Sequence, residues 1–423
     1  MKFVTEIRQK ELFKVTSLNS ISVLIKILVG FVSSKVIAIF VGPSGMALVG
    51  NLRNFVTSLE SVATLGFQNG IIKYVAEYEK EPQKIKAFLS TVVISIFGIT
   101  LLLSGCLFWA SDYLNDKIFG VNFRYQSVFR ALALCLPWYI ASLFLVTVLN
   151  GFGEFKKVIK INIYGNIVGL ILSVALICYW QEFGALLSVI IAPAVLFFVT
   201  LFFVNSKIAF FKVSLKQFDF GIIKNLAEYS LMTLVAAVLG PMVYLLIRNN
   251  IIHDLGYEDA GYWEAMSRIS SYYLLFLSTI LTVYFLPKLA KSADNQETKK
   301  VIWSYFNGIF PVFLLGLLVL YFLKDWLIPI ILTKSFLPVS GLFFGQLLGD
   351  VFKALSLILG YQFFAKKMTK AFLITELFSL TVLWVSSTYF ISVYGVEGAV
   401  IAHAVTYFVY FLTLLVYFRK IVF

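Results

Sequence analysis

The sequence has few charged residues and very few histidines. Only 13% of its 423 residues are Asp, Glu, Lys or Arg, and 60% are hydrophobic, whereas soluble domains carry about 25% charged residues. Its two histidines form no H-E-x-x-H or other metal motif, and no G-x-x-x-x-G-K-[ST] loop occurs, which excludes ATP hydrolysis by that route. We therefore expect no catalytic residue, no metal site and no cofactor, apart from a coupling H⁺ or Na⁺.

The sequence also lacks a long polar segment. A membrane-crossing helix needs about 20 mostly apolar residues, and twelve such stretches cover most of the chain. They lie at 17–41, 45–67, 86–110, 125–149, 161–180, 184–204, 225–247, 260–286, 301–323, 340–364, 371–392 and 396–418. The pattern predicts an all-α polytopic membrane protein without a soluble domain. The first stretch is too long for the core of a cleavable signal peptide.

The net charge of +13 is unevenly distributed. When the connections are assigned to alternate sides of the membrane, 24 Lys and Arg share the side of the N-terminus and five lie opposite. By the positive-inside rule, this asymmetry places both termini in the cytoplasm. Because topology accounts for most of the basic excess, we expect no nucleic-acid partner.

The longest polar break in mid-chain divides the predicted crossings into two sets of six. It predicts lobes at 1–204 and 225–423, joined by a cytoplasmic linker at 205–224. Because six is even, a repeat would be parallel, with a pseudo-twofold axis along the membrane normal. The segments EFKKVIK (154–160) and FAKKMTK (364–370) match at an offset of 210 and favour such a repeat.

The segment GNLRNFVTSLESVATLGF (50–67) carries charges where lipid would be expected. Arg53 and Glu60 lie seven residues apart on one helical face, flanked by Asn51 and Asn54. A charge inside the bilayer costs about 3 kcal/mol on insertion scales, so this face is expected to line a polar cavity. Glu60 is interpreted either as the partner of Arg53 or as a coupling site.

Other predicted crossings carry ionisable side chains as well. Glu264 with Arg268, and Asp350 with Lys353, have the spacing of local ion pairs. A structural role and a cavity role stay open for both pairs. Lys35 lies near the outer end of its helix, where it is able either to face the cavity or to extend to the interface. His403 is interpreted as a packing residue.

The intramembrane charges do not balance within each half. The first half holds Lys26, Lys35, Arg53 and Arg130 against Glu60, and the second holds Arg268 and Lys353 against Glu228, Glu264, Asp350 and Glu376. The first lobe is therefore predicted to be basic, which suits an anion such as a phosphate. The second is predicted to be acidic, which suits a coupling cation.

Three segments resemble one known family over nearly the whole chain. The most specific is FVGPSGMALVGNLRNFVTSLESVATLGFQNGIIKYVAEY (40–78), and the others are YFLPKLAK (284–291) and QLLGDVFKALSLILGYQFFAK (346–366). They look like the Wzx-type flippases of lipid-linked oligosaccharides, which include O-antigen translocases and lipid III flippases.

The resemblance implies the fold of the multidrug and oligosaccharidyl-lipid exporter superfamily, with two six-helix lobes in a V around a central cavity. It implies an inner-membrane protein that moves an undecaprenyl-pyrophosphate-linked oligosaccharide from the cytoplasmic to the periplasmic leaflet by alternating access. It also places basic residues at Lys26, Lys35, Arg53 and Lys353 and an acid at Asp350. Glu264 and Arg268 depart from the family pattern.

The residue pattern and the resemblance together give a set of candidate site residues. Pyrophosphate or substrate binding is predicted for Lys26, Lys35, Arg53, Arg268, Lys353, Asn51 and Asn54. Coupling or charge pairing is predicted for Glu60, Glu264, Asp350 and Glu376. We expect a monomer whose partners are the bilayer, the lipid-linked glycan and glycan-assembly proteins.

Two alternative functions stay open at this point. A drug or organic-cation antiporter would share the fold, but its cavity should be acidic, and Arg53 and Lys26 oppose this. A membrane glycan polymerase or ligase would need a sizeable outer loop, whereas the outer connections here have about 16 residues or fewer. A transporter is therefore favoured over an enzyme.

Overall fold

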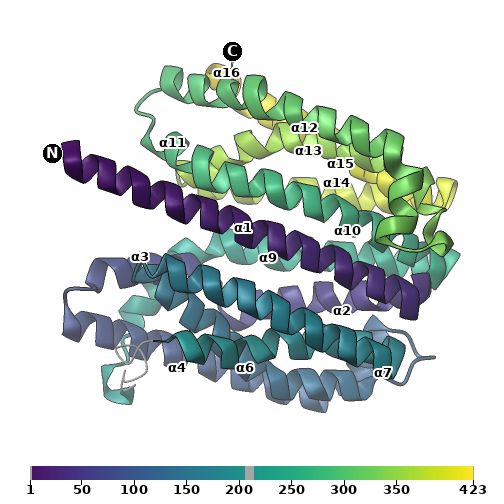
Figure 1. Cartoon of the computed structure of the whole chain (residues 1–423), viewed down its shortest axis with the longest axis horizontal. Helices are drawn as coiled ribbons and strands as arrows, with labels where there is room; N and C mark the ends of the chain where they lie inside the picture. Colours follow the sequence, from purple (N-terminus) through teal and green to yellow (C-terminus); the bar gives the residue numbers. More distant parts are fainter. Residues whose placement is uncertain (1, 205–213, 423) are drawn as a thin grey trace. The chain divides into compact units, whose positions relative to one another are not determined.

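The computed structural model describes the backbone of residues 2–204 and 214–422, and side chains from residue 20 onward except those of 205–213, 228, 229 and 423. Over this part of the chain all regular structure is helical, which confirms the predicted all-α class (Figure 1). The stretch 205–213 of the predicted linker, the N-terminal side chains and the side chain of Glu228 lie outside the described part.

The helices follow the long apolar runs of the sequence. In the first part of the chain they are α1 (Lys2–Phe40), α2 (Gly42–Ala63), α3 (Gln68–Tyr78), α4 (Pro82–Trp109), α5 (Ser111–Ile118), α6 (Gln126–Gly151), α7 (Phe155–Phe203) and η1 (Leu215–Gln217). In the second part they are α9 (Phe220–Leu255), α10 (Tyr257–Ile280), η2 (Leu281–Phe285), α11 (Leu286–Lys291), α12 (Asn295–Ile331), η3 (Lys334–Phe336), α13 (Val339–Ala365), α14 (Thr369–Tyr394), α15 (Val396–Tyr417) and α16 (Arg419–Val422).

Each of the twelve predicted apolar stretches falls on a helix. Ten helical segments of the described chain are long and apolar enough to cross a membrane. One of them, α7, contains two predicted stretches, because the backbone turns at Gln181, where φ is 47° and ψ is −118°. The predicted stretch at 45–67 corresponds to α2, which is outside those ten because of its polar face. The chain is a multi-pass membrane protein, and the count of twelve crossings stays a prediction.

The chain divides into two compact units, which are described separately. Unit 1 comprises Met1–Ser33 and Phe55–Val238, and unit 2 comprises Ser34–Asn54 and Leu239–Phe423. These units do not follow the predicted boundaries at 204 and 225, because residues 34–54 group with the second part of the chain. The predicted two-lobe boundary and the pseudo-twofold repeat therefore stay predictions.

In unit 1, α6 packs against α4 and α7, and α3 and α5 also pack against α6. Leu149 on α6 and Val158 and Ile161 on α7 form a buried cluster at one end of this pair. The two parts of α7 approach closely after the turn at Gln181. A Cβ atom on Gly184 would lie 1.9 Å from the carbonyl oxygen of Leu176, so glycine is required there.

In unit 2, α13 lies among α10, α12 and α15, and α14 packs against α15. Figure 1 shows α12 to α15 side by side in green and yellow. More than half of the most apolar window of α13 is buried, at 61%, so α13 is the central helix of this unit. Tyr305 on α12 is fully buried and donates a hydrogen bond of 2.9 Å to the carbonyl oxygen of Ala354 on α13.

We predict that Gly184→Ala lowers the stability of the protein. The new Cβ would overlap the backbone of Leu176, and such overpacking costs about 1–3 kcal/mol. Gly169→Ala in the same helix is the matched control, because its Cβ would lie 3.6 Å from Ala192, an ordinary contact. Heating detergent-solubilised protein before size-exclusion chromatography measures the difference. Equal midpoints for the two variants would contradict the close approach within α7.

Candidate functional site: an arginine cluster around Glu264

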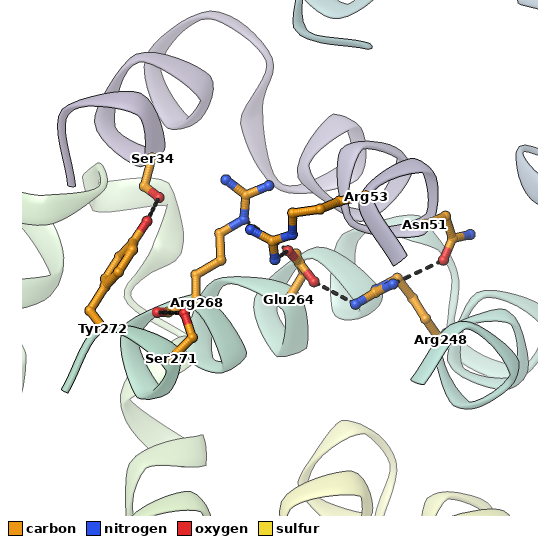
Figure 2. Close-up of polar contacts among 8 residues, drawn as sticks. All are labelled: Ser34, Asn51, Arg53, Arg248, Glu264, Arg268, Ser271 and Tyr272. Atoms are coloured by element: carbon orange, nitrogen blue, oxygen red, sulfur yellow. Dashed lines mark hydrogen bonds and ion pairs between the residues drawn. The ribbon is translucent and has the colours of Figure 1, made fainter. Parts of the chain in front are cut away.

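Four charged side chains of unit 2 converge on one place in the structure. Arg53 lies on α2, Arg248 on α9, and Glu264 and Arg268 one helical turn apart on α10. Figure 2 shows the three guanidinium groups around the carboxylate of Glu264. We call these four residues the arginine cluster.

Glu264 is the centre of the arginine cluster. Its side chain has no solvent exposure, and those of Arg248 and Arg268 have 1% and 6%. Oε1 accepts hydrogen bonds from Arg53 Nη2 and, at 2.8 Å, from Arg268 Nε, while Oε2 accepts one from Arg248 Nη2. The expected pairing of Glu264 with Arg268 is confirmed. Three positive charges meet one negative charge, so the arginine cluster has a net positive charge.

Two glycines allow the helices of the arginine cluster to approach. A Cβ on Gly50 would lie 2.6 Å from the carboxyl carbon of Glu264, and a Cβ on Gly261 would lie 1.9 Å from the carbonyl oxygen of Pro43. The absence of side chains at these positions lets α2 and α10 pack closely. The carboxylate of Glu264 is therefore held against the backbone of α2, one turn from Arg53.

Further contacts hold Arg248 in place. Its Nη1 donates a hydrogen bond of 3.1 Å to Oδ1 of Asn51, and Asn51 donates one of 2.9 Å to Asn249. Its guanidinium also lies 5.2 Å from the ring centroid of Trp263, within the range of a cation–π contact. The predicted crossing at 225–247 stops one residue before Arg248, whereas α9 extends to Leu255 and Arg248 is buried within it.

Two buried donors on α2 and α9 find no hydrogen-bond partner among the described residues. They are Nε of Arg248 and Nδ2 of Asn54. An unsatisfied buried donor destabilises the folded state by about 1–3 kcal/mol. The side chain of Arg53 is 40% exposed, so the arginine cluster is accessible on this side. Free donors, excess positive charge and an exposed arginine together suit an anionic ligand.

A second buried network surrounds Asp350 on α13, which is fully buried. Its carboxylate accepts hydrogen bonds from Ser270 at 2.6 Å and from Tyr273, both on α10, and from Gln346 at 3.3 Å. His403 Nε2 on α15 lies 2.9 Å from Oδ1 of Asp350 and donates to it, because a carboxylate only accepts.

Asp350 and Lys353 interact electrostatically, as expected for a pair, but the residue in direct contact with this carboxylate is His403. Lys353 instead lies 4.8 Å from the ring centroid of Tyr407. A Cβ on Gly349 would lie 2.2 Å from Cδ2 of His403, so glycine lets the imidazole reach α13. The sequence analysis interpreted His403 as a packing residue and missed this contact. Its i, i+4 spacing to Tyr407 was the one available signal, and their rings lie 4.7 Å apart.

The other predicted site residues lie in different places. Lys35 in unit 2 donates hydrogen bonds to the carbonyl oxygens of Pro329, at 2.8 Å, and Leu332, at the end of α12. Glu376 on α14 interacts electrostatically with Lys353. In unit 1, Glu60 accepts a hydrogen bond from Tyr139 and interacts electrostatically with Lys26. Substrate or coupling roles for these residues stay predictions.

The structure alters two of the predictions about charged residues. The carboxylate that pairs with Arg53 is Glu264, so Glu60 is not required as its partner. Arg53 and Lys35 fall in unit 2, where Arg248 adds a further buried positive charge. The prediction of a basic first lobe and an acidic second lobe therefore does not describe these units, because the excess of arginine lies in unit 2. Among the described residues, no group of three His, Cys, Asp or Glu side chains is arranged to hold a metal ion.

We predict that Glu264→Gln strongly destabilises the protein, because it leaves three arginines without their common carboxylate. Removing one partner of a buried ion pair costs roughly 3–5 kcal/mol. Glu258→Gln is the matched control on the same helix, because Glu258 is exposed and accepts a hydrogen bond from Tyr262. Thermal unfolding in detergent measures both variants, and the double variant Glu264→Gln with Arg248→Met should recover part of the loss. A midpoint for Glu264→Gln equal to that of Glu258→Gln would contradict the central role of this carboxylate.

The chain is similar to proteins of known name and to solved structures. Over 401 residues, 95% of this chain, the sequence is 27% identical to the lipid III flippase of Escherichia coli (strain K12), of which the match covers 96%.

Two solved structures share the fold. An inward-facing multidrug resistance MATE family transporter has a TM-score of 0.77 at 13% identity, over 93% of this chain and 95% of that one. The lipid II flippase MurJ has a TM-score of 0.71 at 17% identity, over 96% of this chain and 87% of that one. These likenesses confirm the expected superfamily fold. Residues 12–293 match the profile described as polysaccharide biosynthesis protein, and the chain belongs to that family.

Proposed function

We propose that this protein is a flippase that moves an undecaprenyl-pyrophosphate-linked oligosaccharide across the bacterial inner membrane, from the cytoplasmic to the periplasmic leaflet, by alternating access. The name of the lipid III flippase relative supports the lipid-linked glycan as substrate. The distribution of Lys and Arg along the sequence supports cytoplasmic termini. Glycan-assembly proteins are the proposed partners, and the protein acts as a monomer.

The observation that carries this proposal is the net positive arginine cluster inside a membrane protein. Buried ions are ordinarily balanced, because an unpaired charge in a medium of low polarity is costly. Here three guanidinium groups share the single carboxylate of Glu264. A pyrophosphate would add negative charge beside them, and its oxygens would accept hydrogen bonds from Nε of Arg248 and Nδ2 of Asn54, which find no partner among the described residues.

The side chains suit the parts of such a substrate. The planar guanidinium of Arg53 is able to bind phosphate oxygens through two parallel hydrogen bonds. Sugar hydroxyls cannot enter hydrocarbon without losing their hydrogen bonds to water, so the glycan needs a polar path, whereas the polyprenyl tail stays in lipid. Ser271 on α10 and Ser34 and Tyr272, which share a hydrogen bond of 2.8 Å, lie near the arginine cluster and offer hydroxyl groups to sugars (Figure 2).

The same charge argument opposes an organic cation as the substrate. A drug antiporter that carries cations would need acidic residues at its binding site, whereas Glu264 is already shared by three arginines. Its carboxylate accepts from all of them, which leaves it unsuited to bind a cationic ligand. The arginine cluster therefore supports an anionic substrate over a cationic one.

Coupling to a cation belongs to the proposal as well. Asp350 is bonded to His403, and a carboxyl group and an imidazole are both able to carry a proton. Protonation of this pair would change the charge between α13 and α15 and shift the equilibrium between two conformations of the protein. Glu60, half-buried and bonded to Tyr139 in unit 1, is a second acid able to take up a proton.

We predict that Arg53→Ala lowers the rate of translocation. Loss of a charge-assisted hydrogen bond costs about 1.5–3 kcal/mol, which corresponds to a decrease of roughly 10- to 100-fold. The translocation rate of Arg53→Lys should lie between those of the wild type and Arg53→Ala, because lysine keeps the positive charge but not the planar guanidinium. The assay is transfer of a polyprenyl-pyrophosphate-linked glycan across proteoliposome membranes. The control is Arg124→Ala, an exposed arginine between α5 and α6.

A glycan on a polyprenyl monophosphate sharpens this test. Because the proposed contact is to the pyrophosphate, Arg53→Ala should affect the monophosphate substrate less than the pyrophosphate substrate. Wild-type rates for a correctly folded Arg53→Ala protein would rule out the anion site.

We also predict that Asp350→Asn removes the dependence of transport on an ion gradient, because the coupling carboxylate can no longer gain or lose a proton. Wild-type protein should slow when the proton gradient is collapsed, whereas the variant should give the same rate with and without it. Asp325→Asn, an exposed position near the end of α12, is the control. Wild-type transport that persists after both proton and sodium gradients are collapsed would disprove coupling and leave the flippase proposal standing.

A further inference from the structure

A cavity of about 710 Å³ lies at one end of unit 2, far in sequence from the arginine cluster. Its walls come from the beginning of α12, the end of α13 and the start of the next connection, the end of α15, and α16. Three helices that are long and apolar enough to span a membrane therefore meet at this end, where phospholipid headgroups lie. Figure 1 shows α16 and the C-terminus at that end of the unit.

Most of the charged residues in the cavity wall are basic. Lys366, Arg419 and Lys420 line the cavity, together with one acid, Asp294. Asp294 is the N-cap of α12, and its Oδ1 accepts a hydrogen bond of 2.8 Å from the backbone nitrogen of Glu297. Lys366 donates one hydrogen bond of 2.6 Å to the carbonyl oxygen of Ser292, which holds its ammonium group in the wall. An ammonium group has three donors, so two stay available to a ligand.

Gln362 supplies an independent indication of a ligand. Its side chain lines the cavity, is only 3% exposed, and leaves Oε1 without a hydrogen-bond partner among the described residues. Buried polar atoms nearly always have a hydrogen-bond partner, so we expect a polar group of a ligand next to this amide inside the cavity. The unpaired oxygen is an acceptor, and the group that it needs is a donor such as a hydroxyl or a primary ammonium.

Another part of the wall is apolar and open to the surroundings. Val416 and Tyr417, in the last turn of α15, are 68% and 47% exposed. Tyrosine is typical of the membrane interface because its ring prefers the apolar side and its hydroxyl the polar side. Basic residues above such a surface are suited to a ligand with an anionic head and an apolar body.

We propose that this cavity binds the phosphate headgroup of a membrane lipid. The phosphate oxygens accept from Lys366, Arg419 and Lys420, and a hydroxyl or primary ammonium next to the phosphate donates to Oε1 of Gln362. The acyl or isoprenoid chain runs along Val416 and Tyr417. This site is separate from the arginine cluster, and the inference does not depend on which glycan the protein carries.

The first test is lipid binding to the delipidated full-length protein, measured by native mass spectrometry. Phosphatidylglycerol and phosphatidylethanolamine carry both a phosphate and a donor, whereas phosphatidylcholine carries a phosphate without one, so the first two should bind more tightly. The double variant Arg419→Gln with Lys420→Gln should bind phosphatidylglycerol at least tenfold more weakly. Both residues are exposed, so folding should be retained.

Lys300→Gln with Lys370→Gln is the matched control, since it removes two exposed lysines of the same unit that do not line the cavity. An equal loss in this control would reduce the effect to general attraction between basic residues and anionic lipid and would overturn the proposal. Gln362→Leu should remove the preference for phosphatidylglycerol over phosphatidylcholine. An unchanged preference in that variant would overturn the assigned role of the amide.

Competition between phosphatidylglycerol and other phosphate compounds identifies the source of the phosphate. Glycerol 3-phosphate that binds as tightly as phosphatidylglycerol would indicate a soluble phosphate and overturn the lipid assignment. Displacement of phosphatidylglycerol by polyprenyl pyrophosphate at equal concentration would support a lipid phosphate and name the isoprenoid lipid as its source. Retention of phosphatidylglycerol would support a resident glycerophospholipid.

Discussion

The burial of Glu264 among three arginines is the interaction on which unit 2 depends. One carboxylate accepts hydrogen bonds from Arg53, Arg248 and Arg268, which come from α2, α9 and α10. Because this buried carboxylate is shared by all three arginines, it ties these three helices together. The close approach at Gly50 and Gly261 is the steric condition for that arrangement.

The two buried carboxylates of unit 2 differ in what their partners are able to do. Arginine stays charged at any physiological pH, so the arginine cluster keeps its positive charge and suits a permanent role in anion binding. The partners of Asp350 include Ser270, Tyr273 and His403, and none of them carries a permanent charge as arginine does. The first arrangement suits recognition of a substrate, and the second suits a reversible change of state.

The cost of burying a charge differs between the arginine cluster and the cavity at the end of unit 2. The arginine cluster lies between helices, where every unpaired charge is costly and a ligand must replace lost hydration. The cavity beside Arg419 lies at the end of the membrane-spanning helices, where lysine and arginine meet lipid headgroups with little desolvation. The two proposed sites would therefore bind lipid phosphate in two different environments.

The sequence by itself determined the all-α class, the position of each long helix and the presence of polar faces within apolar helices, because apolar length and helical spacing are local properties. It also predicted the pairing of Glu264 with Arg268, which are one turn apart. It did not predict that Arg248 and Arg53 join them, that His403 pairs with Asp350, or that residues 34–54 group with the second part of the chain. Only the tertiary structure decided these contacts, because they join helices that are distant in sequence and depend on close approach at glycines whose role no local pattern reveals.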